Sequence, residues 1–308
     1  NDQLALRLNQ IEAIILQAGN PEIDAIVSRG GITRPLEAGS YSLTAALLDD
    51  MISHRYAVHP SNLGPLLAEK MAATRGIPCL MVDPVGVDQF EPVARYSGWP
   101  GLQRKSQLHA LNMRSVARRA ARELGGKMEI YSFIIAHLGG GISVGPMQAG
   151  RLIDVNNAMD GGPFSPQRTG TLPLRGIIEL AFSGEFASAS DMIKAFNTRG
   201  GLMAYLGTDD AREVIRRIGS GDGDAEQVYR SMAYQIAKEI GSMASVLRGR
   251  VDRILITGGL ARPPLTEWLR DYCEWIAPIL LYPGEGELEA LAEAAARHLC
   301  EGESLLEY

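Results

Sequence analysis

Two arginines in irregular, glycine-rich surroundings are the residues of this chain best suited to chemistry. Arg29 follows a predicted strand and precedes Gly30 and Gly31, and Arg168 lies in the Gly/Pro/Ser-rich loop 160–173. A planar guanidinium forms paired hydrogen bonds with phosphate or carboxylate oxygens. Most arginines form surface ion pairs instead, as we expect for the arginines of the predicted helix 105–124. Arg29 and Arg168 are therefore candidate anion-binding residues.

Two histidines differ in how strongly their positions indicate function. His137 ends a predicted strand against the triple glycine 139–141, which favours a ligand-binding role. His109 lies at the start of predicted helix 105–124, where a histidine is more often structural.

Acidic residues give a weaker signal. Asp83 follows a predicted strand and could hold a hydrated Mg²⁺ ion, as single carboxylates do in phosphoryl-transfer sites. Glu285, Glu287 and Glu289 lie around the start of the last predicted helix, where the helix dipole favours acids whatever their function.

Three predicted strands end in polar or glycine-rich turns, at residues 83–84, 139–141 and 258–259. Glycine exposes backbone N–H groups and allows a ligand to come close, so such turns are suited to phosphate. One such turn alone is usually only a turn, but three together favour a nucleotide site. The P-loop and dinucleotide-binding motifs GxxxxGK[ST] and GxGxxG are absent from the sequence.

Residues 141–145 match GxSxG, the nucleophile elbow of α/β-hydrolases, with Ser143 as the nucleophile. That elbow needs a helix directly after the serine, whereas residues 146–151 lead into another predicted strand. The sequence context therefore argues against a hydrolase.

Composition narrows the class of protein. The 308 residues are 46% hydrophobic and 21% charged, with a net charge of −6, which is typical of a globular protein and gives no reason to bind nucleic acid or an anionic membrane. The 3 cysteines lie far apart with no CxxC, and no apolar run reaches about 18 residues. We expect a cytoplasmic protein without disulfides or a membrane span.

Hydrophobic periodicity predicts an α/β protein. Predicted strands are 23–27, 77–82, 131–137, 142–144, 151–155, 254–257 and 276–281. Predicted helices are 3–18, 43–52, 61–76, 105–124, 174–183, 188–196, 209–218, 224–248, 264–273 and 286–300. Residues 142–155 form a predicted hairpin that turns at 149–150. The pattern predicts two domains, residues 1–126 with 288–308, and residues 127–287.

Segments spread along nearly the whole chain together resemble the butyrate kinase branch of the acetate and butyrate kinase family, within the acetate kinase–sugar kinase–Hsc70–actin superfamily. The segments that carry the resemblance are residues 28–31, 60–64, 82–84, 91–95, 105–112, 136–145, 154–158, 162–170, 205–212, 257–261 and 282–285.

The resemblance implies an ATP-dependent kinase that makes an acyl phosphate from butanoate. It implies two ribonuclease-H-like α/β domains with the active site in an interdomain cleft, and a homo-oligomer. Family members begin with a β-hairpin that carries a phosphate loop, and residue 1 corresponds to the helix after it, so we expect the first domain to lack its N-terminal hairpin.

The resemblance also implies roles for individual residues. Arg29 and Arg168 would bind the transferred phosphoryl group, His109 would stabilise the transition state, and Asn62 would contact the substrate. Asp83 would position the substrate and Mg²⁺ together with one of Glu285 and Glu287, of which we choose Glu287. The nucleotide would contact His137, Gly139, Gly140, Gly141, Asp210, Arg212, Gly258 and Gly259.

Two alternatives stay open at this point. A non-catalytic nucleotide-binding protein could use the same scaffold, and a kinase of this kind could prefer acetate, propionate or a branched acid. Each buried methylene contributes about 0.8 kcal/mol, so chain length separates such acids only modestly.

Overall fold

The computed structural model describes residues 2–308, which divide into two compact units. Unit 1 comprises the residues up to Asp88 together with Gly286–Tyr308, and unit 2 comprises Gln89–Glu285. The sequence pattern placed the first boundary after residue 126, whereas the structure places it after Asp88. Segment 89–126 belongs to unit 2 because its helix α4 (Ala110–Glu123) packs on the sheet of that unit.

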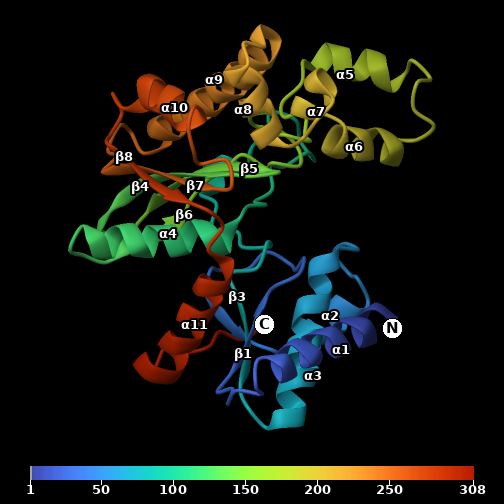
Figure 1. Ribbon diagram of the computed structural model, residues 1–308, viewed down its shortest axis with the longest axis vertical. Helices are drawn as coiled ribbons and strands as arrows, with labels where there is room; N and C mark the ends of the chain where they lie inside the picture. Colours follow the sequence, from blue (N-terminus) through green and yellow to red (C-terminus); the bar gives the residue numbers. More distant parts are fainter. Residues whose placement is uncertain (1) are drawn as a thin grey trace. The chain divides into compact units, whose positions relative to one another are not determined.

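Unit 2 is built on a five-stranded sheet of order β6-β5-β4-β7-β8 (Figure 1). The strands are β4 (Ser132–Leu138), β5 (Ile142–Gln148), β6 (Arg151–Leu152), β7 (Arg253–Gly258) and β8 (Ile279–Pro283). β5 pairs antiparallel with β6, so the hairpin predicted over 142–155 is confirmed, with a longer first strand and a shorter second one. β4 pairs antiparallel with β5 and parallel with β7. The carboxyl ends of β4 and β7 thus lie side by side.

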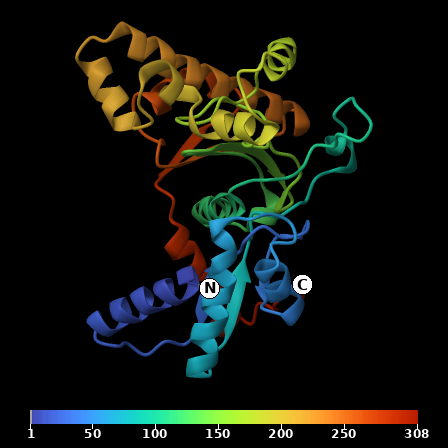
Figure 2. The ribbon, with the colours of Figure 1, turned by 90° about the vertical axis from the view of Figure 1, so that its right-hand side faces the viewer.

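Helices cover both faces of this sheet, α4 on one side and the long α9 (Gly223–Val246) on the other (Figures 1 and 2). The other helices of unit 2 are η2 (Pro92–Arg95), η3 (Met128–Ile130), α5 (Leu174–Ala181), α6 (Ala189–Thr198), α7 (Gly201–Leu206), α8 (Ala211–Gly219) and α10 (Leu265–Cys273). α4 begins at Ala110, so the prediction of helix from residue 105 is wrong, and His109 is the residue that precedes the first turn.

Unit 1 has a smaller sheet of order β1-β3-β2, made of β1 (Ile26–Arg29), β3 (Cys79–Val82) and β2 (Ser40–Ser42). β1 and β3 are parallel, and Arg29 pairs with Val82 at their carboxyl ends. Arg29 is therefore the last residue of β1, whereas the sequence predicted that it follows the strand. The three-residue strand β2 was not predicted.

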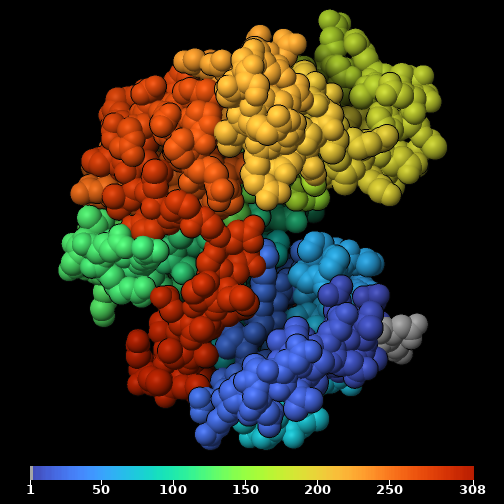
Figure 3. All heavy atoms as spheres, viewed as in Figure 1, coloured from blue at the N-terminus to red at the C-terminus, as the bar shows by residue number. Residues whose placement is uncertain are grey.

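The helices of unit 1 are α1 (Asp2–Gln17), α2 (Ala45–Ile52), η1 (Pro60–Asn62), α3 (Leu63–Arg75) and α11 (Glu287–Glu301). α3 and α11 pack against β1 and β3 from opposite sides, and α1 lies on α3 at the surface of the unit (Figures 1 and 3). In the part of the chain that the structure describes, no helix combines the length and apolar character needed to cross a membrane.

Candidate active site

The turn between β4 and β5 consists of the three glycines 139–141. The Gly139 N–H donates to the Gly141 carbonyl over 3.2 Å, which holds the turn tight. A Cβ placed on Gly140 would have no atom within 4 Å, so one face of the turn is open. The turn can therefore present backbone N–H groups to a ligand without a side chain in the way.

Arg168 lies directly against this turn. A Cβ on Gly141 would stand 2.5 Å from Arg168 Nη1, so only glycine at 141 lets the guanidinium come this close. Ser165 fixes the arrangement, because its hydroxyl donates to the Gly140 carbonyl over 2.6 Å and accepts from the Arg168 N–H over 3.2 Å. Burial lowers the pKa of Arg168 from its usual range, which starts so high that the side chain stays cationic at neutral pH. The sequence-predicted arginine and glycine turn thus lie together and form one candidate anion-binding surface.

His109 and His137 stack on each other, with ring centroids 3.9 Å apart and planes 13° from parallel. His137 is buried at the end of β4, and its Nδ1 lies 2.7 Å from Asn112 Oδ1. Asn112 Nδ2 donates to the Glu285 carbonyl, so its Oδ1 faces His137 and Nδ1 of that ring carries the proton. Nδ1 of His109 lies 3.0 Å from the Ser143 hydroxyl. The hydroxyl of the GxSxG serine therefore lies beside His109. Ser143 stands within strand β5 and not at the strand-to-helix turn that a nucleophile elbow requires.

The end of β7 brings the second glycine turn beside the first. Gly258 has φ +95° and exchanges backbone hydrogen bonds of 3.0 and 3.1 Å with Gly284. A Cβ on Gly258 would lie 2.3 Å from the Leu138 carbonyl oxygen, so this glycine lets the chains of β4 and β7 approach. Gly259 meets nothing within 4 Å and is open like Gly140.

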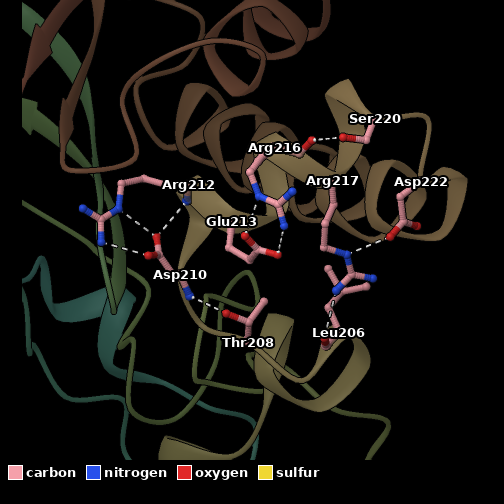
Figure 4. A network of polar contacts seen from close by, with 9 residues as sticks. All are labelled: Leu206, Thr208, Asp210, Arg212, Glu213, Arg216, Arg217, Ser220 and Asp222. Carbon is pink, nitrogen blue, oxygen red and sulfur yellow. Dashed lines mark hydrogen bonds and ion pairs between the residues drawn. The ribbon is translucent and has the colours of Figure 1, made fainter.

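Asp210 and Arg212 form an exposed pair at the start of α8 (Figure 4). Asp210 caps the helix by accepting from the Arg212 N–H over 2.9 Å, and it binds the guanidinium through both oxygens at 3.0 and 2.8 Å. These hydrogen bonds, chiefly that from the Arg212 side chain, lower the pKa of Asp210 to about 2. The pair therefore stays charged and holds the Arg212 fork in one place.

One cavity of about 360 Å³ in unit 2 collects many of the predicted nucleotide residues. Its lining includes Gly139, Gly140, Asp210, Arg212 and Gly259. The other three predicted residues, His137, Gly141 and Gly258, do not line it but support the glycine turns from behind.

Further lining residues were not predicted as nucleotide contacts, and these include Gln167, Asp209, Tyr229, Arg262 and Glu285, the last of which was a candidate metal ligand. Gln167 stands beside Arg168 in the loop already singled out and donates to Asp209, so its neighbourhood was a usable signal. Tyr229 lies within α9, where the sequence shows only an amphipathic helix.

In unit 1, three predicted residues gather at the carboxyl ends of β1 and β3. Arg29 ends β1, Asp83 follows β3, and Glu287 begins α11. Arg29 Nη1 binds both carboxylate oxygens of Glu287, at 2.8 and 3.0 Å. Asp83 is 2% exposed and has φ +37°.

Asn62, predicted to contact the substrate, uses its amide within unit 1. Its Oδ1 accepts from the Ile32 N–H over 2.9 Å, and its Nδ2 donates to the Ala57 carbonyl over 2.9 Å. A Cβ on Gly31 would lie 2.4 Å from this Oδ1. Asn62 therefore holds the loop that follows Arg29.

The donor chemistry of unit 1 fits magnesium. Within residues 2–308, no cluster of three or more His, Cys, Asp and Glu side chains is suited to hold a metal ion. Mg²⁺ needs only one or two carboxylates beside water and phosphate oxygens, and Asp83 and Glu287 supply hard oxygen donors of that kind at one sheet edge. If Glu287 binds the metal ion, its carboxylate must either bind Arg29 and the ion together or release Arg29.

Comparison with known proteins gives consistent results. Residues 100–264 match the model of the acetokinase family. The chain is 48% identical over 301 residues to probable butyrate kinase 2 of Caldanaerobacter subterraneus subsp. tengcongensis, an alignment that covers 97% of this chain and 85% of that protein.

Solved structures with a similar fold include two kinases. The acetate kinase of Porphyromonas gingivalis has a TM-score of 0.77 at 20% identity, over 89% of this chain and 78% of that one. A propionate kinase from Francisella tularensis subsp. tularensis has a TM-score of 0.78 at 18% identity, over 92% of this chain and 82% of that one. At this identity, these two comparisons show a shared mixed α/β fold with two sheets.

Proposed function

This chain belongs to the acetokinase family, and from that premise we propose that it is an ATP-dependent short-chain fatty acid kinase that converts butanoate and ATP into butanoyl phosphate and ADP. The observation that carries the proposal within the structure is the cavity of unit 2, which combines two open glycine turns with the Asp210–Arg212 pair. A turn of this kind binds phosphate through backbone N–H groups, and a cavity of about 300 Å³ or more suits a small organic ligand.

The reaction needs no catalytic base. A short-chain carboxylic acid has a pKa of about 4.8, close to that of Glu, so it is already a nucleophilic carboxylate at neutral pH. The enzyme must instead align two anions and reduce their repulsion, which is the main task in phosphoryl transfer. Arg168 and Arg29 are the proposed ligands of the transferred phosphoryl group, and His109 is the proposed donor to its oxygens in the transition state.

His137, Asn112 and Ser143 then act as positioning residues in this proposal. The stacked His137 ring fixes the plane of His109, and the Ser143 hydroxyl sets its orientation. Asn112 links His137 to the Glu285 carbonyl and thereby to the rim of the nucleotide cavity.

Asp83 and Glu287 are the proposed protein ligands of Mg²⁺. The ion would neutralise part of the charge of the ATP phosphates when bound. Glu287 then exchanges its present partner, and Arg29 becomes available to an anionic ligand.

The finer fold assignment belongs to the same proposal: two ribonuclease-H-like domains with the reactants in a cleft between them, acyl-binding residues in the first and nucleotide-binding residues in the second. Asn62 acts there through the loop it holds. Assembly into a dimer or larger oligomer is proposed on the family resemblance alone.

A hydroxamate-trapping assay tests the function. We expect the purified chain with ATP, Mg²⁺ and butanoate to give butanoyl hydroxamate, and reactions with acetate, propionate and isobutyrate show which acid is preferred. Nucleotide binding without hydroxamate from any of these acids would identify a binding protein and overturn the proposal. Hydroxamate from another acid only would keep the kinase and correct the substrate.

A further inference from the structure

Tyr229 is the most deeply buried polar residue in the lining of the unit 2 cavity. It comes from α9, its side chain is 0% exposed, and it lines the same cavity as the glycine turns. Its ring packs edge-on against Trp268 with centroids 6.0 Å apart. The hydroxyl makes no hydrogen bond to any group in the part of the chain that the structure describes.

A buried hydroxyl without a partner destabilises a protein, because it has lost its hydrogen bonds to water. Phenylalanine would keep the contact with Trp268 and avoid that cost. Because Tyr229 lines the cavity, a ligand that fills the cavity can supply the missing partner. Nothing in the packing of α9 itself calls for an oxygen at this position.

The rest of the cavity lining indicates which part of a ligand Tyr229 meets. Ile215 and Leu260 give the cavity an apolar wall, whereas the phosphate-binding features are the glycine turns. Burial raises the pKa of Tyr229 to about 12, against the opposite influence of Arg262, so the hydroxyl stays neutral and can donate. A neutral donor beside apolar side chains suits a heteroaromatic ring better than a phosphate.

We propose that Tyr229 is a specificity-determining residue whose hydroxyl hydrogen-bonds to the purine base of the nucleotide. This inference rests on the proposed function only in taking ATP as the ligand of the cavity. It adds a base-reading residue from α9 to a site otherwise built from turns and from the start of α8.

The test is Tyr229→Phe, with nucleotide affinity measured by calorimetry. We expect ATP and ADP to bind about five- to tenfold more weakly, which is the effect of one lost neutral hydrogen bond. Inorganic tripolyphosphate, which has no base, should bind the variant and the original chain equally. The unliganded Tm should stay the same or rise, since the hydroxyl has no protein partner to lose.

Tyr234→Phe is the matched control. Tyr234 lies on the same helix, is 52% exposed and does not line the cavity, so its variant should bind ATP normally. A structural role for Tyr229 predicts a lower unliganded Tm with unchanged affinity, and that result would overturn the inference.

The two proposals can fail separately. ATP affinity unchanged in Tyr229→Phe while hydroxamate is formed normally would refute the role of Tyr229 and leave the kinase standing. If the original chain forms no hydroxamate but the variant binds ATP more weakly than it does, the kinase function is refuted and the role of Tyr229 in nucleotide binding stands. An equal loss of tripolyphosphate affinity would contradict base recognition, and a chain that binds no adenine nucleotide at all would overturn both proposals.

Discussion

The two units differ in whether their candidate site residues already have partners within the protein. In unit 2 the glycine turns leave open faces at Gly140 and Gly259, and the Tyr229 hydroxyl has no partner among the described residues. In unit 1 Arg29 is bound by Glu287, and the Asn62 amide is used by the loop. Under the proposed function, the contrast predicts a nucleotide cavity that is formed before the ligand arrives and an Arg29 that must first exchange its partner.

The surroundings of the candidate residues also differ. Unit 2 has one large cluster of buried side chains that joins its sheet to α8, α9 and α10. In unit 1 an ion pair, Arg29–Glu287, stands at the edge of the sheet. A rigid frame suits a preformed pocket, and an ion pair at a sheet edge suits residues that rearrange.

Loss of either arginine should have the largest effect. Arg168→Ala and Arg29→Ala should each lower kcat about 10³-fold, the scale of an arginine that stabilises a transferring phosphoryl group. Lysine restores the charge without the paired hydrogen bonds, so Arg168→Lys should recover only part of the rate. Steady-state kinetics measures this.

Arg175→Ala is the control, because this arginine on α5 is 92% exposed. The contrast between the units also predicts that Glu287→Gln frees Arg29 but weakens metal binding, so a higher Mg²⁺ requirement should accompany it. A kcat within threefold of the original in both alanine variants would remove the arginines from the mechanism.

Two glycine variants should distinguish a glycine that is needed for packing from one that faces open space. Gly258→Ala introduces a methyl 2.3 Å from the Leu138 carbonyl at φ +95°, and should lower the free energy of unfolding by about 3 kcal/mol. Gly140→Ala meets no atom within 4 Å and should leave stability within about 0.5 kcal/mol while weakening nucleotide binding. Thermal unfolding and nucleotide titration together check the pair, and the reverse ranking of the two unfolding effects would contradict the structure.

Two tyrosine–carboxylate pairs, one in each unit, give the smallest effect. Tyr308 donates to Asp50, whose side chain is 8% exposed, and Tyr282 donates to Glu123, whose side chain is 49% exposed, both over 2.7 Å. Tyr308→Phe should cost about 1.5 kcal/mol because it leaves a buried carboxylate with one partner fewer, and Tyr282→Phe less than about 1 kcal/mol. Amide hydrogen exchange measured in β1 and β3 of unit 1, and separately in β4 and β7 of unit 2, shows which unit each variant destabilises.

The pairs also have a signature in pH. Burial, together with the hydrogen bond to the carboxylate, raises the pKa of both tyrosines above the ordinary value. Their stabilising contribution is therefore complete below pH about 10 and is lost as the pH rises further. Each phenylalanine variant should show a shallower loss of Tm as the pH rises above about 10. An identical slope in all three proteins would contradict the raised pKa values.

Local patterns predicted most of the fold and the loops of the site. The β5–β6 hairpin and the glycine turns are specified by neighbouring residues, and they lie where the sequence placed them. The start of α4 was misplaced because the apolar pattern continues upstream of Ala110 into non-helical chain. Strand β2 was missed because three residues carry no periodicity and depend on pairing with β3.

The missed parts of the site depend on contacts across the sequence. Arg29 and Glu287 are 258 positions apart, so no local pattern links them. Tyr229 resembles any core tyrosine of an amphipathic helix. What distinguishes it is that it lines a cavity while its hydroxyl has no hydrogen-bond partner among the described residues. The roles of the site residues stay predictions until the variants are measured.

The join between β8 and α11 has a consequence that holds whatever the protein does. Glu285 lines the cavity of unit 2, Glu287 holds Arg29, and Gly286 alone stands between them with φ +55°. Covalent geometry keeps the Cα atoms of 285 and 287 within about 7 Å in every conformation. The backbone at the cavity rim and the backbone that carries the partner of Arg29 can therefore never separate further than one left-handed glycine allows.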